Sequence, residues 1–335
     1  MKYILTSGVL FIGYWADGFY MLIRGLSIPI FNNYLNVKKV NEKLILKALN
    51  FLSYFCIVSG IPFLLNLVQP ISRGYVLEDY GAENNGFVGI FQNPHGAAII
   101  ISQALLILLF NIVQAKKINH FKIIIFLLGC FILYKTYVRT GYMMFFVGIF
   151  FLIKIEYGIK KLYKIAPLVI LLAFGAYSFY QSDTALQGRI KQENIYSKDD
   201  SFSIDKLSSG RLTLSYVNLK NWSERDPFSI IFGLGFQYST DLMLEDINMR
   251  KASHNGFVDA LVHNGLIGFM LYILFLGSIF RKIKKSKNSI YYSLGISSFI
   301  AFLLFILFQG GNVFLLEILL LMIIYLLQLT KGQKN

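Results

Sequence analysis

Residues 251–274 read KASHNGFVDALVHNGLIGFMLYIL, and within this stretch a polar, loop-like sequence becomes an almost wholly apolar one. The same kind of transition recurs along the chain, which is 56% hydrophobic and 15% charged and contains 31 Phe and 21 Tyr. A water-soluble domain of 335 residues does not carry this balance. The composition therefore indicates a polytopic membrane protein, and the quoted stretch marks a place where a loop enters the bilayer.

Apolar runs define the expected spans. A helix that crosses the hydrocarbon core needs about 20 mostly apolar residues, because the core is about 30 Å thick and a helix rises about 1.5 Å per residue. Runs that approach this length are 3–23, 45–68, 96–114, 121–136, 141–155, 165–180, 255–280, 290–309 and 312–329. We therefore predict an all-α fold, a transmembrane bundle of about nine helices. Residues 1–180 would hold six spans, 181–253 a large external loop with short helices, and 254–335 the last three spans.

Basic residues gather in every second loop between these runs. They are Lys38, Lys39, Lys43, Lys47, Lys116, Lys117, Lys122, Lys154, Lys160, Lys161, Lys164, Arg281, Lys282, Lys284, Lys285, Lys287, Lys331 and Lys334. Because basic loops stay in the cytoplasm, we expect an external N-terminus and a cytoplasmic C-terminus. The net charge of +14 does not indicate nucleic-acid binding, since these residues form no single patch interleaved with aromatics. The N-terminal segment lacks the short apolar core and cleavage site of a signal peptide, and we expect it to be retained.

The predicted external loop, 181–253, is far longer than a connection requires. Loops beyond about 15 residues are usually functional or disordered. Part of this loop should be ordered, because Leu212, Tyr216 and Leu219 recur at helical spacing and predict a helix that begins near Arg211. The later run FGLGF predicts a turn held against the membrane surface by its aromatic residues.

Three predicted helix N-termini on the external side carry polar residues. The third span opens with NPHG (residues 93–96), the fifth with RTGY (139–142) and the seventh with SHN (253–255). A helix N-terminus offers unpaired N–H groups and the positive end of a dipole, which together favour an anion. This face is therefore a candidate anion site.

Arginines could complete such a site for pyrophosphate, because guanidinium groups bind phosphate oxygens bidentately. The candidates are Arg139, Arg211 and Arg73. An arginine at a membrane edge can instead be a snorkelling anchor, and this alternative applies to Arg139 and above all to Arg73.

Other polar residues have structural alternatives. Asn255, Asp259 and His263 recur every four residues and fit helix packing as well as chemistry. Neither cysteines nor histidines show the spacing of metal ligands: Cys56, Cys130, His95, His120, His254 and His263. We expect neither a metal site nor a disulfide.

Four motifs follow one another between residues 86 and 275: GIFQNPHGAA; RTGY; the set SSGR, W, DPF and GLGF; and SHNGFVDALVHNGLIG. In this order they resemble the O-antigen ligase and polymerase superfamily of bacterial surface polysaccharide synthesis. The SHN segment followed by an apolar helix with GLIG is the most specific of the four. The resemblance implies a multi-pass protein of the bacterial inner (plasma) membrane. Such a protein takes a glycan linked to undecaprenyl pyrophosphate and transfers it to a sugar hydroxyl outside that membrane.

The resemblance also implies roles for individual residues. Arg211 and Arg139 would hold the pyrophosphate leaving group, where fixed positive groups stabilise developing charge. His254 would lie beside the reacting centre, and at a helix N-terminus a neutral imidazole could accept or orient the acceptor's proton. The expected substrate-binding residues are Arg73, Asn93, His95, Asn255 and Trp222. Similar enzymes are metal-independent and inverting, so no cofactor is expected. Membrane lipid, a chain-length regulator and a flippase of the same pathway are expected partners besides the donor and the acceptor.

Three functions remain open from the sequence. We predict a polymerase that joins undecaprenyl-pyrophosphate-linked repeat units of an O-antigen, a capsule or a related glycan. A ligase that passes the glycan to a lipid A core is the alternative within the family. A transporter or flippase for lipid-linked sugars is the alternative from another class, but it should show helix breaks at matching depths in paired halves, and the sequence shows no such pattern.

Overall fold

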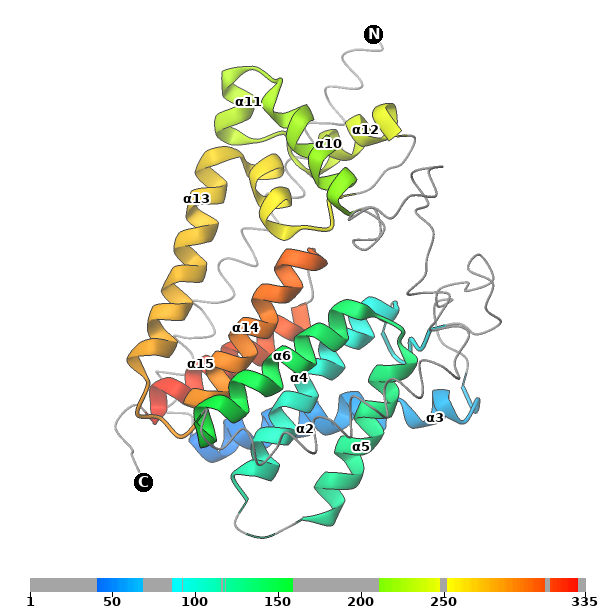
Figure 1. Cartoon of the computed structure of the whole chain (residues 1–335), viewed down its shortest axis with the longest axis vertical. Helices are drawn as coiled ribbons and strands as arrows, with labels where there is room; N and C mark the ends of the chain where they lie inside the picture. The colour runs from blue at the N-terminus through cyan, green and yellow to red at the C-terminus, as the bar shows by residue number, and fades with distance from the viewer. Residues whose placement is uncertain are drawn as a thin grey trace. The chain divides into compact units, whose positions relative to one another are not determined.

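The computed structural model describes residues 41–68, 86–91, 93–115, 117, 119–158, 211–247, 252–310 and 314–330. Every regular element in these residues is an α-helix (Figure 1), so the predicted all-α fold is confirmed. The expected spans 3–23 and 165–180 lie outside the described residues, as do residues 181–210 of the predicted external loop.

The described helices include several that could cross a membrane. In chain order they are α2 (Glu42–Val58), α3 (Ile61–Leu64), α4 (Pro94–Val113), α5 (His120–Lys135), α6 (Arg139–Tyr157), α10 (Arg211–Ser223), α11 (Pro227–Phe232), α12 (Phe236–Ile247), α13 (Gly256–Lys285), α14 (Tyr292–Phe308) and α15 (Phe314–Leu329). Four segments of the described chain have the length and composition of a span: Glu42–Leu64, Pro94–Val113, Arg139–Tyr157 and Gly256–Lys285. These segments support a multi-pass membrane protein, while the number of nine spans and the orientation of the termini stay predictions.

The chain folds into two compact units. Residues 42–193, 282–305 and 313–335 form the first, named here the bundle, which contains α2, α4, α5, α6, α15 and most of α14. Residues 1–41, 194–281 and 306–312 form the second, named here the α13 unit. It contains α10, α11, α12, most of α13 and the last turn of α14. The predicted domain limits at residues 180 and 253 stay predictions.

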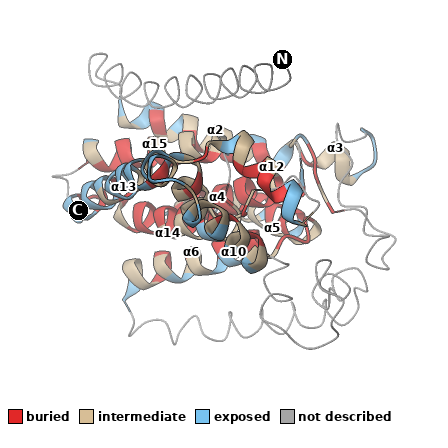
Figure 2. Ribbon diagram, turned by 90° about the horizontal axis from the view of Figure 1, so that it is seen from above, coloured by how far each residue is buried: buried red, intermediate tan, exposed pale blue. Residues whose placement is uncertain are grey.

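Helix α4 is the centre of the bundle. It packs against α2, α5, α6 and α15, and its side chains are buried along most of its length (Figure 2). Small residues allow this close packing: a Cβ on Gly141 of α6 would lie 2.6 Å from the Cβ of Ala98, and a Cβ on Gly148 would lie 2.5 Å from Leu106. Glycine at such crossings brings helix backbones together, which is a common source of stability between membrane helices.

A few hydrogen bonds between polar side chains cross the bundle. Gln103 Nε2 donates to Ser298 Oγ (2.6 Å), and Asn111 Nδ2 donates to Asn50 Oδ1 (2.6 Å). Within lipid a polar side chain must find its partner inside the protein, so these bonds help to fix which helices are neighbours.

Helix α13 is broken at Gly265, which has φ 63° and ψ −170°. The break interrupts the helical hydrogen bonds, and a distant segment replaces them: Leu234 N donates to Val262 O (2.8 Å) and Gly235 N donates to His263 O (3.0 Å). The predicted FGLGF turn thus docks by its backbone onto the break in α13. The predicted span 255–280 is a candidate span, but it is not one continuous helix.

Glycine is required on both sides of this docking. A Cβ on Gly233 would lie 2.3 Å from His263 O, and a Cβ on Gly265 would lie 2.3 Å from Ile231 O. Both residues also have positive φ, which side chains with a Cβ rarely adopt. We name this contact of residues 231–235 with residues 262–265 the glycine lock.

A small apolar core lies beside the glycine lock. Leu234, Leu242 and Val262 are buried in it, and the partly buried side chains around them are Leu219, Trp222, Tyr238 and Val258. This core joins α10, α12 and the first turns of α13, which lie together in Figure 1.

Candidate functional site

Arg211 is the first residue of α10, and its guanidinium group is bound to the end of α14. Nη1 donates to the carbonyl oxygen of Phe308, and Nη2 donates to Gln309 Oε1 at 3.1 Å. The predicted helix start near Arg211 is confirmed. Because two nitrogens of the guanidinium are held, the orientation of its plane is fixed before any ligand binds.

The SHN turn (residues 253–255) precedes α13 and is closed by a carboxylate. Ser253 is buried, and both its backbone N–H (3.0 Å) and its hydroxyl (2.6 Å) donate to Asp259 Oδ1. Asn255 Oδ1 accepts from the backbone N–H groups of Phe257 (3.0 Å) and Val258 (3.3 Å). Asn255 therefore caps α13, a role that asparagine commonly has at helix N-termini.

His254 lies between these two anchored residues in the left-handed region, with φ 56°. His tolerates this region better than most residues that have a Cβ, although the conformation is uncommon. A residue held there costs of order 1–3 kcal/mol and persists only where its surroundings fix it, which occurs most often at functional sites. The hydrogen bonds of Ser253 and Asn255 supply that fixing.

Gly310 connects the turn with the end of α14. Its φ is 61°, and a Cβ on it would lie 3.0 Å from Asp259 Oδ2 and 3.2 Å from the backbone nitrogen of Gly256. Phe308 and Gln309, which hold Arg211, directly precede it. Ser215 of α10 adds a weak link, since its hydroxyl lies 3.5 Å from Ser253 O.

Three segments distant in sequence thus meet in the α13 unit. We name them together the Arg211 cluster: Arg211, the SHN turn, Asp259 and residues 308–310. The cluster combines a fixed guanidinium, an imidazole on a strained backbone and the N-terminus of the segment of α13 that precedes the break at Gly265. Such a combination can bind an anion and hold a proton acceptor beside it.

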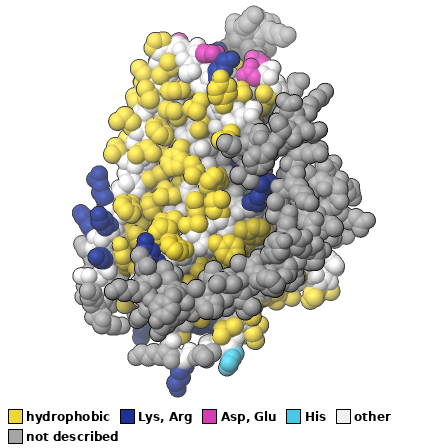
Figure 3. All heavy atoms as spheres, viewed as in Figure 1, with side chains coloured by type: hydrophobic (Ala, Val, Ile, Leu, Met, Phe, Trp, Pro, Cys, Tyr) yellow, Lys and Arg dark blue, Asp and Glu magenta, His cyan; other side chains and the backbone are white. Residues whose placement is uncertain are grey.

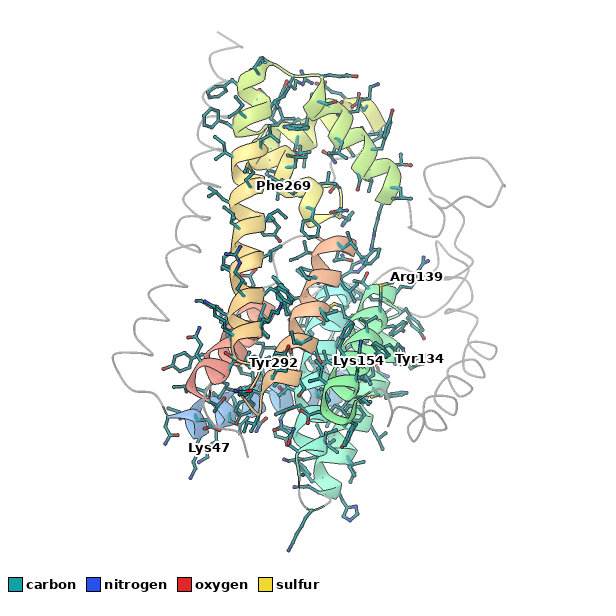
Figure 4. All side chains as sticks on the ribbon, turned by 60° about the vertical axis from the view of Figure 1, so that its left-hand side comes forward. Lys47, Tyr134, Arg139, Lys154, Phe269 and Tyr292 are labelled. Carbon is teal, nitrogen blue, oxygen red and sulfur yellow. The ribbon has the colours of Figure 1, made fainter. Side chains whose placement is uncertain are left out.

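The other predicted site residues fall in the bundle and in the small apolar core. Arg139 is the first residue of α6, as predicted, and Figure 4 labels it at that end of the helix. Asn93 caps α4, where its Oδ1 accepts from Gly96 N (2.8 Å), and His95 follows in the first turn after Pro94. The predicted helix starts at Pro94 and Arg139 are confirmed. That Arg139 binds pyrophosphate and that Asn93 and His95 bind substrate stay predictions.

Trp222 lies near the end of α10 against the small apolar core. Its indole Nε1 is buried, and no side chain or backbone group among the described residues accepts from it. A role of Trp222 in binding sugar stays a prediction. Arg73 lies outside the described residues.

The sequence did not predict Asp259, Gln309 and Gly310 as parts of the site. Asp259 had been interpreted as a helix-packing residue, but its carboxylate holds Ser253. Gln309 and Gly310 stand at the end of a long apolar run, and a lone amide there is a signal that could have been used, because polar groups in spans usually have a function. Across the described residues, no group of three His, Cys, Asp or Glu could hold a metal ion.

A comparison with known protein families matches the part of the chain that contains the Arg211 cluster's first two segments. A family model described as O-antigen ligase matches residues 124–273, which include Arg139, Arg211, the SHN turn and the break at Gly265. A search of curated proteins gave no match. The match confirms the resemblance to the O-antigen ligase and polymerase-like superfamily over residues 124–273, which contain three of the four sequence motifs; GIFQNPHGAA lies before them.

Proposed function

We propose that the protein is a membrane glycosyltransferase that polymerises undecaprenyl-pyrophosphate-linked oligosaccharide repeat units at the outer face of the bacterial inner membrane. The observation that carries the proposal is the fixed guanidinium of Arg211 beside the SHN turn in one compact cluster. The superfamily supports a membrane enzyme that acts on a lipid-linked glycan.

The Arg211 cluster can supply the groups that this transfer needs. An acceptor sugar hydroxyl attacks the anomeric carbon of the donor, a new C–O bond forms, and the bond from that carbon to the pyrophosphate oxygen breaks. The hydroxyl proton passes to the imidazole of His254, and the pyrophosphate leaves on its polyprenyl carrier. Attack from the side opposite the leaving group inverts the anomeric centre.

Arg211 would stabilise the charge that develops on the departing pyrophosphate. A pre-oriented donor is effective here because it needs no reorganisation during the reaction. The N-terminus of α13 would add the positive end of a helix dipole, and this step requires no metal ion. Arg139 stays the second predicted phosphate ligand, and Asn93, His95, Asn255, Trp222 and Arg73 stay predicted substrate-binding residues.

A ligase is the second candidate. The description of the matching family, O-antigen ligase, favours it. The two reactions share donor, leaving group and chemistry and differ only in the acceptor, which is a second lipid-linked repeat unit or a lipid A core.

A deletion strain distinguishes the two candidates through its surface glycan. Loss of a polymerase leaves single repeat units attached to the cell surface, whereas loss of a ligase leaves long chains on the undecaprenyl carrier. A normal glycan profile in the deletion strain would reject both.

Complementation of that strain tests the site. Arg211→Lys keeps a positive charge but loses the planar fork, so it should restore little or no transfer. Arg281→Lys is the matched control, because Arg281 is exposed at the far end of α13 and lies outside the Arg211 cluster. Equal restoration by both variants, at equal protein amounts, would remove Arg211 from the mechanism.

The outer-face location is tested with topology reporters. A reporter fused after Lys285 should be cytoplasmic, and one fused between Asp199 and Asp205 should be external. The reverse result would place the Arg211 cluster on the wrong side of the membrane for this reaction.

A further inference from the structure

Helix α11 exposes an aromatic face. Phe228, Ile231 and Phe232 occupy positions i, i+3 and i+4, which share one side of a helix. Their exposed fractions are 69%, 40% and 54%, and the rings of Phe228 and Phe232 lie 4.7 Å apart, centroid to centroid. Two adjoining phenylalanine rings with this exposure indicate a surface that has a partner, because soluble surfaces rarely display contiguous apolar patches.

The glycine lock fixes where this aromatic face lies on the α13 unit. The carbonyl of Ile231 is packed against Gly265, so α11 ends beside the break in α13. Immediately after the break, Leu266, Ile267 and Met270 are all exposed. The aromatic face of α11 therefore adjoins the start of the exposed apolar surface of α13.

The apolar surface of α13 is largely uncovered by protein. Gly256–Lys285 is a candidate membrane span, yet only 17% of its most apolar stretch is buried within the protein. Hydrophobic side chains cover the visible side of α13 in Figure 3. A helix that crosses a bilayer and exposes this much apolar surface would meet lipid there, so the exposed residues of α13 are the side expected to face lipid.

The other end of α11 is polar. The carboxylate of Asp226 accepts from the backbone N–H groups of Phe228 (3.0 Å) and Ser229 (3.1 Å) and from the Ser229 hydroxyl (2.7 Å). The bonds from Ser229 and Phe228 favour the ionised form and lower the pKa of Asp226 below its ordinary value. Glu224, just before it, is also exposed. A charged start and an aromatic face on one short helix are typical of a segment at a membrane surface.

We propose that α11 inserts its Phe228–Ile231–Phe232 face into the bilayer surface, in continuity with the lipid-facing side of α13. The partner is phospholipid, because the aromatic face adjoins the exposed apolar surface of a candidate membrane span. This proposal does not rest on the transfer reaction. Through the glycine lock, the insertion would hold the Arg211 cluster at a fixed depth relative to the phosphate groups of the membrane.

Site-directed spin labels in nanodiscs of phosphatidylethanolamine and phosphatidylglycerol test the proposal. Labels are attached to Phe228→Cys and Phe232→Cys, with Leu271→Cys as the lipid reference and Glu224→Cys, exposed in the connection before α11, as the water reference. Cys56→Ala and Cys130→Ala remove the native thiols. Power saturation then compares the accessibility of each label to oxygen, which partitions into lipid, and to a water-soluble nickel chelate.

We expect positions 228 and 232 to resemble position 271, with oxygen accessibility several times that of the nickel chelate, and position 224 to show the reverse. Nickel accessibility at position 228 equal to that at position 224 would overturn the proposal. Low accessibility to both reagents would also overturn it, because protein would then cover α11. A photoreactive benzoylphenylalanine in place of Phe228, in the chain with native cysteines, gives an independent result: phospholipid adducts support the proposal and protein adducts reject it.

Discussion

Helices α4 and α13 both have the length and composition of a membrane span, yet 72% of the most apolar stretch of α4 is buried within the protein and only 17% of that of α13. Helix α4 is held by side chains that pack closely against small residues such as Gly141 and Gly148. Helix α13 is held at its break by backbone hydrogen bonds from Leu234 and Gly235, and at its start by Asp259.

This difference shows how the two units gain a defined structure. Packing in the bundle is distributed over many contacts, each of them small, so a single change there can be absorbed in part. In the α13 unit a few backbone positions, beside one small apolar core, carry the arrangement. The α13 unit should therefore be sensitive at single positions, both in its chemistry and in its folding.

The largest effect is expected at His254. His254→Asn should lower transfer activity by about 10²- to 10⁴-fold, the usual cost of removing a general base, while the protein accumulates normally. Asparagine tolerates the left-handed region, so this variant separates loss of the imidazole from backbone strain. The measurement is transfer activity divided by the amount of membrane protein.

Two further histidine variants control this test. His254→Ala should lose activity to the same degree, although it also strains the backbone. His263→Ala removes a ring that lies edge-on to Phe236 at 5.4 Å and should lower the protein amount more than the specific activity. If His254→Asn keeps normal transfer activity and only His254→Ala loses it, then residue 254 is needed for the backbone conformation of the turn and not as a proton acceptor.

The glycine lock gives the next largest effect. Gly265→Ala places a methyl group 2.3 Å from a backbone carbonyl that cannot move away, and it forces a residue with a Cβ to positive φ. These two costs together should destabilise the α13 unit by about 3 kcal/mol. Thermal unfolding of the purified protein in detergent measures the change.

The control lies in the same helix. A Cβ on Gly277 meets nothing within 4 Å, so Gly277→Ala should be neutral or slightly stabilising because alanine favours helix. Equal unfolding temperatures for Gly265→Ala and Gly277→Ala would show that the lock contributes no stability.

Substitution at a glycine crossing in the bundle should cost less. Gly141→Ala brings a methyl group to 2.6 Å from Ala98 Cβ and should destabilise by about 1–3 kcal/mol, the usual cost of overpacking. Gly148→Ala meets the flexible side chain of Leu106, which can rotate away, so its cost should be at the lower end. A cost at Gly148 as large as that at Gly265 would contradict the view that the bundle absorbs single changes.

The smallest effect is expected from the helix caps. Asn93→Ala and Asn255→Ala each remove a side-chain oxygen that caps a helix and should each destabilise by about 1 kcal/mol. Both variants should lower the transfer activity, since both residues are predicted to bind substrate, and Asn255→Ala should lower it more because Asn255 adjoins His254 and helps to fix its backbone. Unfolding temperature and transfer activity are measured for both variants. A larger loss of activity in Asn93→Ala than in Asn255→Ala would contradict the prediction.

The sequence predicted those features that depend on neighbouring residues. Pro94 and Arg139 begin helices as expected, because proline suits a first helical turn and an apolar run follows each. The helix that begins at Arg211 was likewise visible from the spacing of its apolar residues.

The features that depend on distant contacts were not predicted. The Asn264–Gly265 pair is a local turn signal that the predicted span 255–280 did not take into account, and the groups that repair the break come from the distant Leu234 and Gly235. The attachment of Arg211 to Phe308 and Gln309 joins parts of the chain that are far apart in sequence. Asp259 fitted a helical stripe so well that its role in closing the SHN turn was missed.

The glycine lock also bears on how this protein can change in length during evolution. The hydrogen bond from Leu234 N to Val262 O brings the two ends of the intervening chain together. A segment whose ends already meet can gain or lose residues without displacing what it connects, and each doubling of its length costs only about 0.6 kcal/mol in closure entropy. Insertions and deletions between α12 and Ser253 are therefore tolerable, whereas a single residue added within 231–235 would shift the register of the lock.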